Sequence, residues 1–151
     1  MSKRRRENPA RRIATDCLAV RMRMLSRAVT GIYDEALRPA GIRVSQLNLL
    51  AHVAANDGVG QSQVGRELCM EKSTLSRNVE RMVRQGWLEV WSGEDDRSQG
   101  LGVTAKGKRL IERTYPMWAK AQRKAKTVLG GPGAVAVGRM VRRLGAPAGG
   151  K

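Results

Sequence analysis

Residues 72–104, KSTLSRNVERMVRQGWLEVWSGEDDRSQGLGVT, decide the fold. The first half of this stretch places apolar residues at helical spacing and predicts a helix over 72–85. The residues of its buried face are Leu75, Val79, Met82 and Val83. Gly86 follows in the position where a glycine commonly ends a helix. The other face of this helix is therefore expected to point outward.

The second half of the stretch changes from helical to alternating spacing. Leu88 and Val90 alternate with their neighbours, and Leu101 and Val103 do the same. The segment between them, residues 92–98, is polar and acidic, as turns often are. Two short strands around a short polar loop predict a β-hairpin.

Two shorter helices are expected before this one. Ser45 is a good N-cap for a helix over 45–56, and a short helix over 62–68 follows. A tight turn then leads into helix 72–85, which gives the helix-turn-helix arrangement, whose second helix enters the major groove of DNA. Together with the hairpin, these helices predict a winged helix-turn-helix.

Longer helices are expected on both sides of this unit. Apolar spacing predicts one over 13–37. After the hairpin, Thr104 is expected to cap a long helix to about residue 129, kinked at Pro116. A glycine-rich break at residues 130–133 precedes a last helix over 134–144.

The predicted fold class is therefore mainly α with a small β-hairpin wing. It combines a winged helix-turn-helix lobe with a helical dimerisation region. The predicted parts are a disordered basic arm at 1–12, an N-terminal dimerisation helix within 13–44, the winged helix-turn-helix at 45–103, and C-terminal dimerisation helices with a tail at 104–151.

Charge points to a polyanionic partner such as nucleic acid, because the formal net charge is +16. The charge is uneven. Residues 45–104 carry six basic and eight acidic groups, whereas residues 105–151 carry twelve and one. Affinity for DNA would then depend on discrete contacts and on the basic arm and helices, not on the net charge of the lobe.

Several classes of protein are not expected. No apolar run approaches the ~20 residues that span a bilayer, and no apolar segment follows the basic start, so we expect a cytoplasmic protein without a membrane partner. Two cysteines do not make a disulfide framework, and with one histidine they argue against a metal site. No common catalytic motif occurs, so neither an enzyme nor a cofactor is expected.

The outward face of helix 72–85 carries side chains that read base edges or hold phosphates. Arginine suits guanine, asparagine suits adenine, and serine and threonine suit either. The candidate DNA-contacting residues are Lys72, Ser73, Thr74, Ser76, Arg77, Asn78 and Arg81. A solvated helix face would look similar, but the hairpin behind it favours DNA binding.

The hairpin resembles a family motif. Residues 95–107, DDRSQGLGVTAKG, are similar to the pattern D-x-R-x5-L-T-x-x-G of the MarR family of winged-helix regulators, with Val103 in the leucine position. Residues 38–46, RPAGIRVSQ, and 72–77, KSTLSR, are also similar to that family. The resemblance spans roughly residues 17–129. It implies a homodimer through the terminal helices, whose two winged domains bind a palindromic operator in double-stranded DNA.

The resemblance also implies roles for single residues. It places Arg97 at the wing tip, in the minor groove, with Asp95 steadying it. Cys69 stands at a turn where the family usually has a glycine, so it is expected to need a strained φ. Cys17 lies near the position of the reactive cysteine in the peroxide-sensing branch, which makes it a candidate redox residue. The alternative for Cys17 is a small buried hydrophobe.

An effector pocket between the dimer helices and the DNA-binding lobe is a further implication of the resemblance. Family effectors are often aromatic acids or phenols. The candidate pocket residues are Arg23, Arg27, His52 and Trp118. An arginine there could hold a carboxylate bidentately, although a solvated stripe and a satisfied histidine are the alternatives.

The sequence as a whole predicts a sequence-specific DNA-binding transcription regulator, a repressor released by a small-molecule effector. Two alternatives stay open. One is a constitutive or architectural nucleic-acid-binding protein, favoured by the charge, and the other is a cysteine-based oxidant-sensing repressor.

Overall fold

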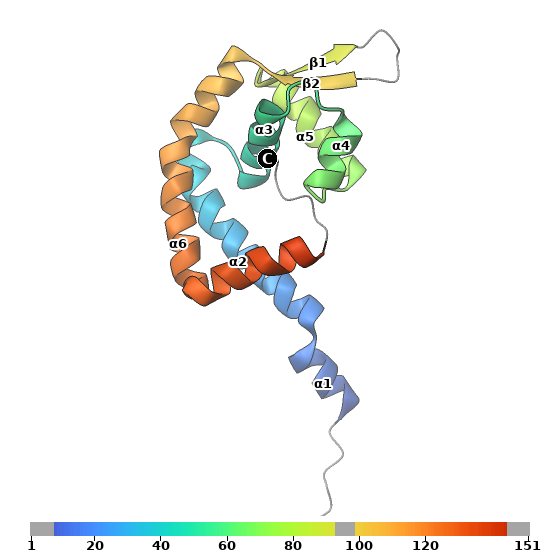
Figure 1. Ribbon diagram of the computed structural model, residues 1–151, viewed down its shortest axis with the longest axis vertical. Coiled ribbons are helices and arrows are strands. Elements are labelled where there is room, and N and C mark those ends of the chain that lie inside the picture. The colour runs from blue at the N-terminus through green and yellow to red at the C-terminus, as the bar shows by residue number, and fades with distance from the viewer. Residues whose placement is uncertain (1–7, 93–98, 145–151) are drawn as a thin grey trace, which may run out of the picture.

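The computed structural model describes residues 8–92 and 99–144 and is mostly helical with one hairpin (Figure 1). The elements are α1 Pro9–Asp16, α2 Leu18–Leu37, the 3-10 turn η1 Arg38–Ala40, α3 Val44–Ala55, α4 Gln61–Glu67, α5 Lys72–Arg84, β1 Leu88–Ser92, β2 Gln99–Val103 and α6 Ala105–Arg143. This order confirms the predicted fold class. The predicted wing-tip residues Asp95 and Arg97, like residues 1–7 of the predicted arm, lie outside the described residues.

The core of the lobe is aliphatic. It is formed where α3, α4, α5 and the hairpin meet, and its fully buried side chains include Leu50, Val64, Met82 and Leu101. One predicted core residue of α5 is wrong: Val83 is 38 % exposed, because at about 100° per residue it lies at the edge of the stripe formed by Leu75, Val79 and Met82.

The start of α3 also differs from the prediction. Ser45 lies inside the helix and is not its cap. The Asp34 carboxylate accepts the backbone N–H of Val44 at 2.8 Å, and the Gln46 side-chain oxygen accepts that of Arg43 at 3.0 Å. A cap supplied by α2, ten residues earlier in the chain, is a tertiary contact that local spacing does not reveal.

The hairpin is antiparallel, with Leu88 opposite Val103 and Val90 opposite Leu101. A short segment before α4 adds to its edge, because Gly58 donates to the Leu101 carbonyl and Leu101 donates to the Val59 carbonyl, at 3.2 and 2.9 Å. The hairpin is thereby joined both to α5, directly before it, and to the start of α4.

The N-terminal prediction of a disordered arm and one long helix is wrong in two places. Asn8 caps α1 by accepting the N–H of Ala10 at 3.0 Å, so residues 9–12 of the predicted arm are helical. Cys17, with ψ 112°, then separates α1 from α2. Arg21 of α2 donates to the last turn of α1 at Thr15, which keeps the two helices connected.

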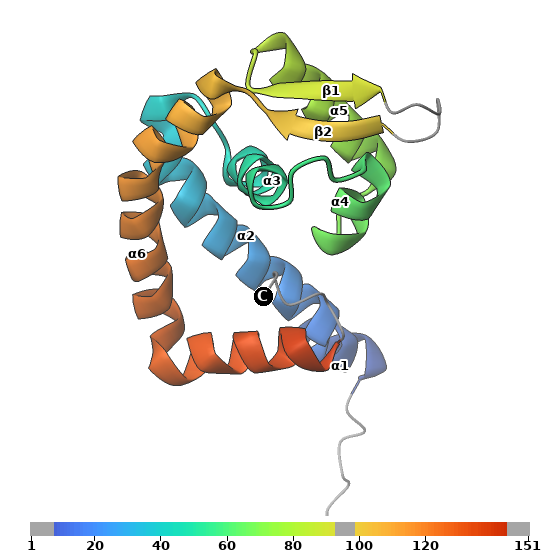
Figure 2. The ribbon, with the colours of Figure 1, turned by 45° about the horizontal axis from the view of Figure 1, so that its top comes forward.

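The C-terminal break is confirmed and falls at a single residue. Gly130 alone within α6 leaves the helical region, with φ 68° and ψ 157°, whereas Pro116 lies inside continuous helix. Pro132 follows in the first turn after the break, where a missing N–H costs nothing. The two parts of α6 and helix α2 lie as three sides of a triangle beside the lobe (Figures 1 and 2). Tyr33 of α2 donates to Gln122 of α6, and burial raises the pKa of Tyr33.

The predicted strain at Cys69 is confirmed, since its φ is 51°, the only positive φ of a non-glycine residue among those described. A residue that carries a Cβ atom is strained in the left-handed region of the backbone, whereas glycine is not. We expect Cys69→Gly to raise the free energy of unfolding by about 1 kcal/mol, measured by urea denaturation under reducing conditions. Cys69→Ala keeps the Cβ and should change it little. An equal gain in both variants would assign the effect to the thiol and not to the backbone.

Candidate functional site

Helix α5 presents the predicted residues largely on its solvent side. Leu75, Val79 and Met82 are buried, whereas Lys72, Ser73, Thr74, Arg77 and Arg81 are exposed. Asn78 is half-buried. Arg77 folds back along the helix, with its Nε donating to the Ser73 carbonyl at 3.2 Å. The structure thus gathers most of the predicted DNA-contacting residues on one surface.

Ser76 differs from the rest of the set. Its hydroxyl accepts a hydrogen bond from the Gln61 side-chain nitrogen at 3.0 Å, so it joins α5 to the start of α4. Its proposed role toward DNA therefore competes with a structural contact between the two helices of the helix-turn-helix.

Arg84 is an outward-facing residue that the sequence prediction missed. It lies two turns after Arg77, at the i+7 spacing that repeats a helix face, and it is exposed. The seven-residue spacing from Arg77 would have predicted that Arg84 lies on the same face.

The end of the hairpin motif holds the last turn of α5 in place. Thr104 accepts the N–H of Gly107 at 3.1 Å and donates to the Gly86 carbonyl at 2.6 Å. Lys106 donates to the Gln85 carbonyl at 2.7 Å. These contacts give the T-x-x-G part of the motif a physical role: it fixes α5 relative to α6.

The predicted effector residues are placed on separate surfaces. Arg23 and Arg27 are exposed on α2. His52 of α3 lies with its Nε2 2.6 Å from a carboxylate oxygen of Glu67 in α4. Gln63 donates to the other oxygen of Glu67 at 3.0 Å, and this hydrogen bond, together with His52, lowers the pKa of Glu67. The contact between His52 and Glu67 therefore joins α3 to α4.

Trp118, the fourth predicted effector residue, lines an apolar hollow between α3 and α6. The hollow has a volume of about 240 Å³ and is lined by Leu47, Asn48, Ala51, Ile111, Thr114, Tyr115 and Trp118. The rings of Tyr115 and Trp118 are stacked with centroids 5.9 Å apart. An apolar hollow with an aromatic wall suits an aromatic ligand.

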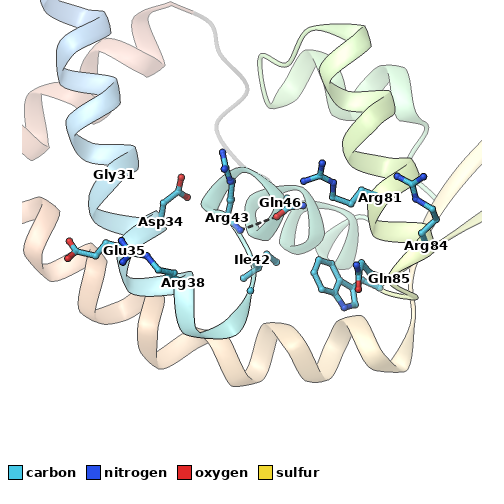
Figure 3. Close-up of a pocket in the computed structure, with 12 residues that line it drawn as sticks. Gly31, Asp34, Glu35, Arg38, Ile42, Arg43, Gln46, Arg81, Arg84 and Gln85 are labelled. Carbon is cyan, nitrogen blue, oxygen red and sulfur yellow. Dashed lines mark hydrogen bonds between the residues drawn. The ribbon is translucent and has the colours of Figure 1, made fainter.

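A larger and more polar cavity lies beside α5 (Figure 3). Its volume is about 850 Å³, and its walls come from the end of α2, the start of α3, the last turns of α5 and the residue before β1. Four arginines line it: Arg38, Arg43, Arg81 and Arg84. No sequence pattern predicts this cavity, because its residues are distant in the chain.

Cys17 is half-buried at the break between α1 and α2. Over residues 8–92 and 99–144, no cluster of three or more His, Cys, Asp or Glu residues could hold a metal ion. In the same part of the chain, no helix is both long enough and apolar enough to cross a membrane.

The terminal helices expose large apolar side chains. In α1 and α2 these include Ile13, Leu18 and Met24, which are 67–71 % exposed. In the second part of α6 and directly after it they are Val135, Met140, Val141 and Leu144. Apolar residues exposed on the helices at both ends of the chain mark a surface suited to a partner.

The chain is similar to known regulators in sequence and in structure. Residues 40–98 match the sequence model of the MarR family. YwoH of Bacillus subtilis (strain 168), an uncharacterized HTH-type transcriptional regulator, is 25 % identical over 87 residues, which are 58 % of this chain and 64 % of YwoH. The match thus covers slightly less than two thirds of that relative.

Solved structures match over most of the chain. The M. tuberculosis transcriptional regulator MosR, solved in complex with DNA, is 30 % identical, with a TM-score of 0.75 over 88 % of this chain and 96 % of MosR. A mutant MarR from E. coli, solved with operator DNA, is 16 % identical, with a TM-score of 0.77 over 88 % of this chain and 96 % of MarR, and shows the same fold.

Proposed function

The chain belongs to the MarR family of transcription regulators, and on this premise we propose that it is a homodimeric, sequence-specific repressor that binds double-stranded operator DNA through α5. The observation that carries the proposal is the outward face of α5. Arginine, lysine, serine and threonine side chains occupy it, and few of them are engaged by neighbouring elements.

A dimer with two such helices would read two half-sites. The exposed apolar residues of α1, α2 and the second part of α6 support association of two copies there. In dimeric helix-turn-helix proteins the half-sites lie about 34–36 Å apart, so the operator would be palindromic.

Regulation by a small aromatic molecule is the second part of the proposal. The hollow lined by Trp118 and Tyr115 has the apolar lining and the size for one ring system. It contacts α3, which belongs to the DNA-binding lobe, and α6, which continues into the proposed dimer interface. A ligand there would touch both parts.

The test is a binding-site selection with Arg77→Ala and Arg97→Ala. We expect Arg77→Ala to weaken operator binding by roughly 1–3 kcal/mol and to relax one base position in each half-site, because its guanidinium would lie in the major groove. Arg97→Ala should lose a similar amount and keep the half-site preference, because the minor groove distinguishes little beyond A·T from G·C.

The matched control is Arg123→Ala, which changes an exposed arginine on α6. It should keep the operator affinity within a factor of about 2 and select the same sequence as the parent protein. Equal binding of operator and random duplexes by the parent protein would contradict sequence-specific recognition and would favour the constitutive nucleic-acid-binding alternative.

A further inference from the structure

The hairpin has an inner face that joins the core of the lobe and an outer face that does not. Leu88 and Leu101 point inward and are buried. Because side chains alternate along a strand, Trp91 lies on the outer face, where its partner in β2 is Gly100. Trp91 is 42 % exposed, so packing in the core does not account for its position.

The ring of Trp91 lies directly against the backbone of Gly102, which is diagonally across from it in β2. A Cβ atom at residue 102 would lie 2.6 Å from Cζ2 and 2.8 Å from Cε2 of this ring. The ring therefore fills the place that a side chain at residue 102 would need. An aromatic ring that covers a glycine of the neighbouring strand strengthens the pairing of the two strands.

The same ring reaches a third segment beyond β2. A Cβ atom at Gly58 would lie 3.7 Å from Cζ3 of Trp91. Gly58 belongs to the segment that pairs with the edge of β2, through hydrogen bonds from Gly58 to Leu101 and from Leu101 to Val59. This segment leads directly into α4. Trp91 thus connects the end of β1, across β2, to the start of the helix-turn-helix.

The end of β1 has little support from the core. Figures 1 and 2 place it, with the start of β2, at the end of the hairpin farthest from α6. Leu88 at the start of β1 is buried, whereas Val90 is 41 % exposed and lines an open groove of about 460 Å³ beside α5. Pairing with β2 and the ring of Trp91 therefore hold this end of the strand.

We propose that Trp91 is a positioning residue of the wing. Its ring, seated on Gly102 and against Gly58, sets the direction in which the hairpin leaves the lobe. The consequence for DNA rests on the proposed function: the wing meets the minor groove correctly, relative to α5, only while the ring is seated. Trp91 acts through the hairpin and does not contact DNA itself.

The first test is amide hydrogen exchange of the full chain without DNA, followed by NMR. In Trp91→Ala we expect the N–H groups of Gly58 and Leu101 to exchange at least about tenfold faster, because their hydrogen bonds open more easily. The amides of α3 should keep their rates within a factor of about 2, which shows that the lobe stays folded. The matched control is Val90→Ala, which removes a side chain of nearly equal exposure from the inner face and should speed this exchange less than about threefold.

Two further variants separate the seated ring from the mere presence of a large residue. Trp91→Phe keeps an aromatic ring and should exchange within about threefold of the parent protein. Gly102→Ala keeps the tryptophan but displaces its ring, because the added Cβ would lie 2.6 Å from it, so this variant should speed exchange as Trp91→Ala does. Exchange like that of the parent in Trp91→Ala or in Gly102→Ala overturns the proposal.

The second test measures operator binding. Trp91→Ala should weaken it at least about fivefold, lower the preference for A·T-rich over G·C-rich flanks and keep the half-site sequence. In an Arg97→Ala background the same change should weaken binding less than about twofold, because the contact of the wing is already lost. A general structural defect would weaken binding equally in both backgrounds, and that result overturns the proposal.

The outcomes separate this proposal from the proposed function. The exchange experiment contains no DNA, so its failure leaves the repressor function standing. Weaker operator binding by Trp91→Ala without faster exchange would indicate a direct contact between Trp91 and DNA, and the positioning role would be wrong. Equal binding of operator and random duplexes by the parent protein would contradict the proposed function, whereas the exchange rates would still decide whether Trp91 positions the hairpin.

Discussion

Gly107→Ala is expected to lower the free energy of unfolding by about 3 kcal/mol or more, because the added methyl group overlaps atoms that are already packed there. A Cβ at residue 107 would lie 2.2 Å from the backbone oxygen of Trp87 and 2.7 Å from a methyl carbon of Val103. Gly107 is itself buried, and backbone atoms cannot rotate away from the added methyl group. Urea denaturation followed by circular dichroism measures the loss.

Gly31→Ala is the matched control for this change. Gly31 lies inside α2, and a Cβ there would meet nothing within 4 Å. This variant should be unchanged or more stable by roughly 0.5–1 kcal/mol, because alanine favours helix over glycine. If Gly107→Ala melted like Gly31→Ala, the close approach of α6 to Trp87 would not exist in solution.

DNA binding should fall along with stability in Gly107→Ala. The displaced contact lies next to Thr104 and Lys106, whose hydrogen bonds reach the carbonyls of Gly86 and Gln85 at the end of α5. A shift there would change the position of α5 relative to α6. The last glycine of the family-like motif is thus explained by packing, and a contact with DNA is not needed to account for it.

Local chemistry predicted the elements whose signals lie within a few residues. The alternation around residues 88–103 gave the hairpin, Thr104 gave the start of α6, and the glycine at 130 gave its break. For these elements the deciding interaction is made by neighbours in the chain. The strain at Cys69 was predicted instead from the resemblance to the family, since a cysteine at a glycine position must adopt the same backbone.

Tertiary contacts account for the differences. The cap of α3 comes from Asp34 in another helix, which is why Ser45 was the wrong choice. The resemblance made His52 a candidate for the effector pocket, and only the fold shows Glu67 beside it. The cavity lined by four arginines joins residues 31–46 to residues 81–87, and no sequence pattern connects those segments. Sites built across elements require the fold before they can be recognised.

A chain ending at Gly130 is expected to lose both the dimer and tight operator binding. The deletion removes the second part of α6 and the residue after it, in which Val135, Met140, Val141 and Leu144 are 44–83 % exposed in the single chain. These side chains have little to bury against within one copy, and burial against a second copy would stabilise an interface by about 25 cal/mol per Å² of apolar surface removed from water. Light scattering should report a monomer for the shortened chain and a dimer for the full one.

Operator affinity should fall on the order of 100-fold or more for the shortened chain, because two linked half-site contacts become two independent ones. A chain ending at Leu144 is the control and should stay dimeric, since it keeps all of α6. Met140→Glu in the full chain tests the same interface should the shortened chain prove unstable, because a carboxylate buried between two copies without a partner opposes association. The lobe carries its own core, so circular dichroism of Met140→Glu should keep its helical signal. A dimer that survived both the deletion and Met140→Glu would place the interface elsewhere, and the exposed residues of α1 and α2 would then be the surface to change next.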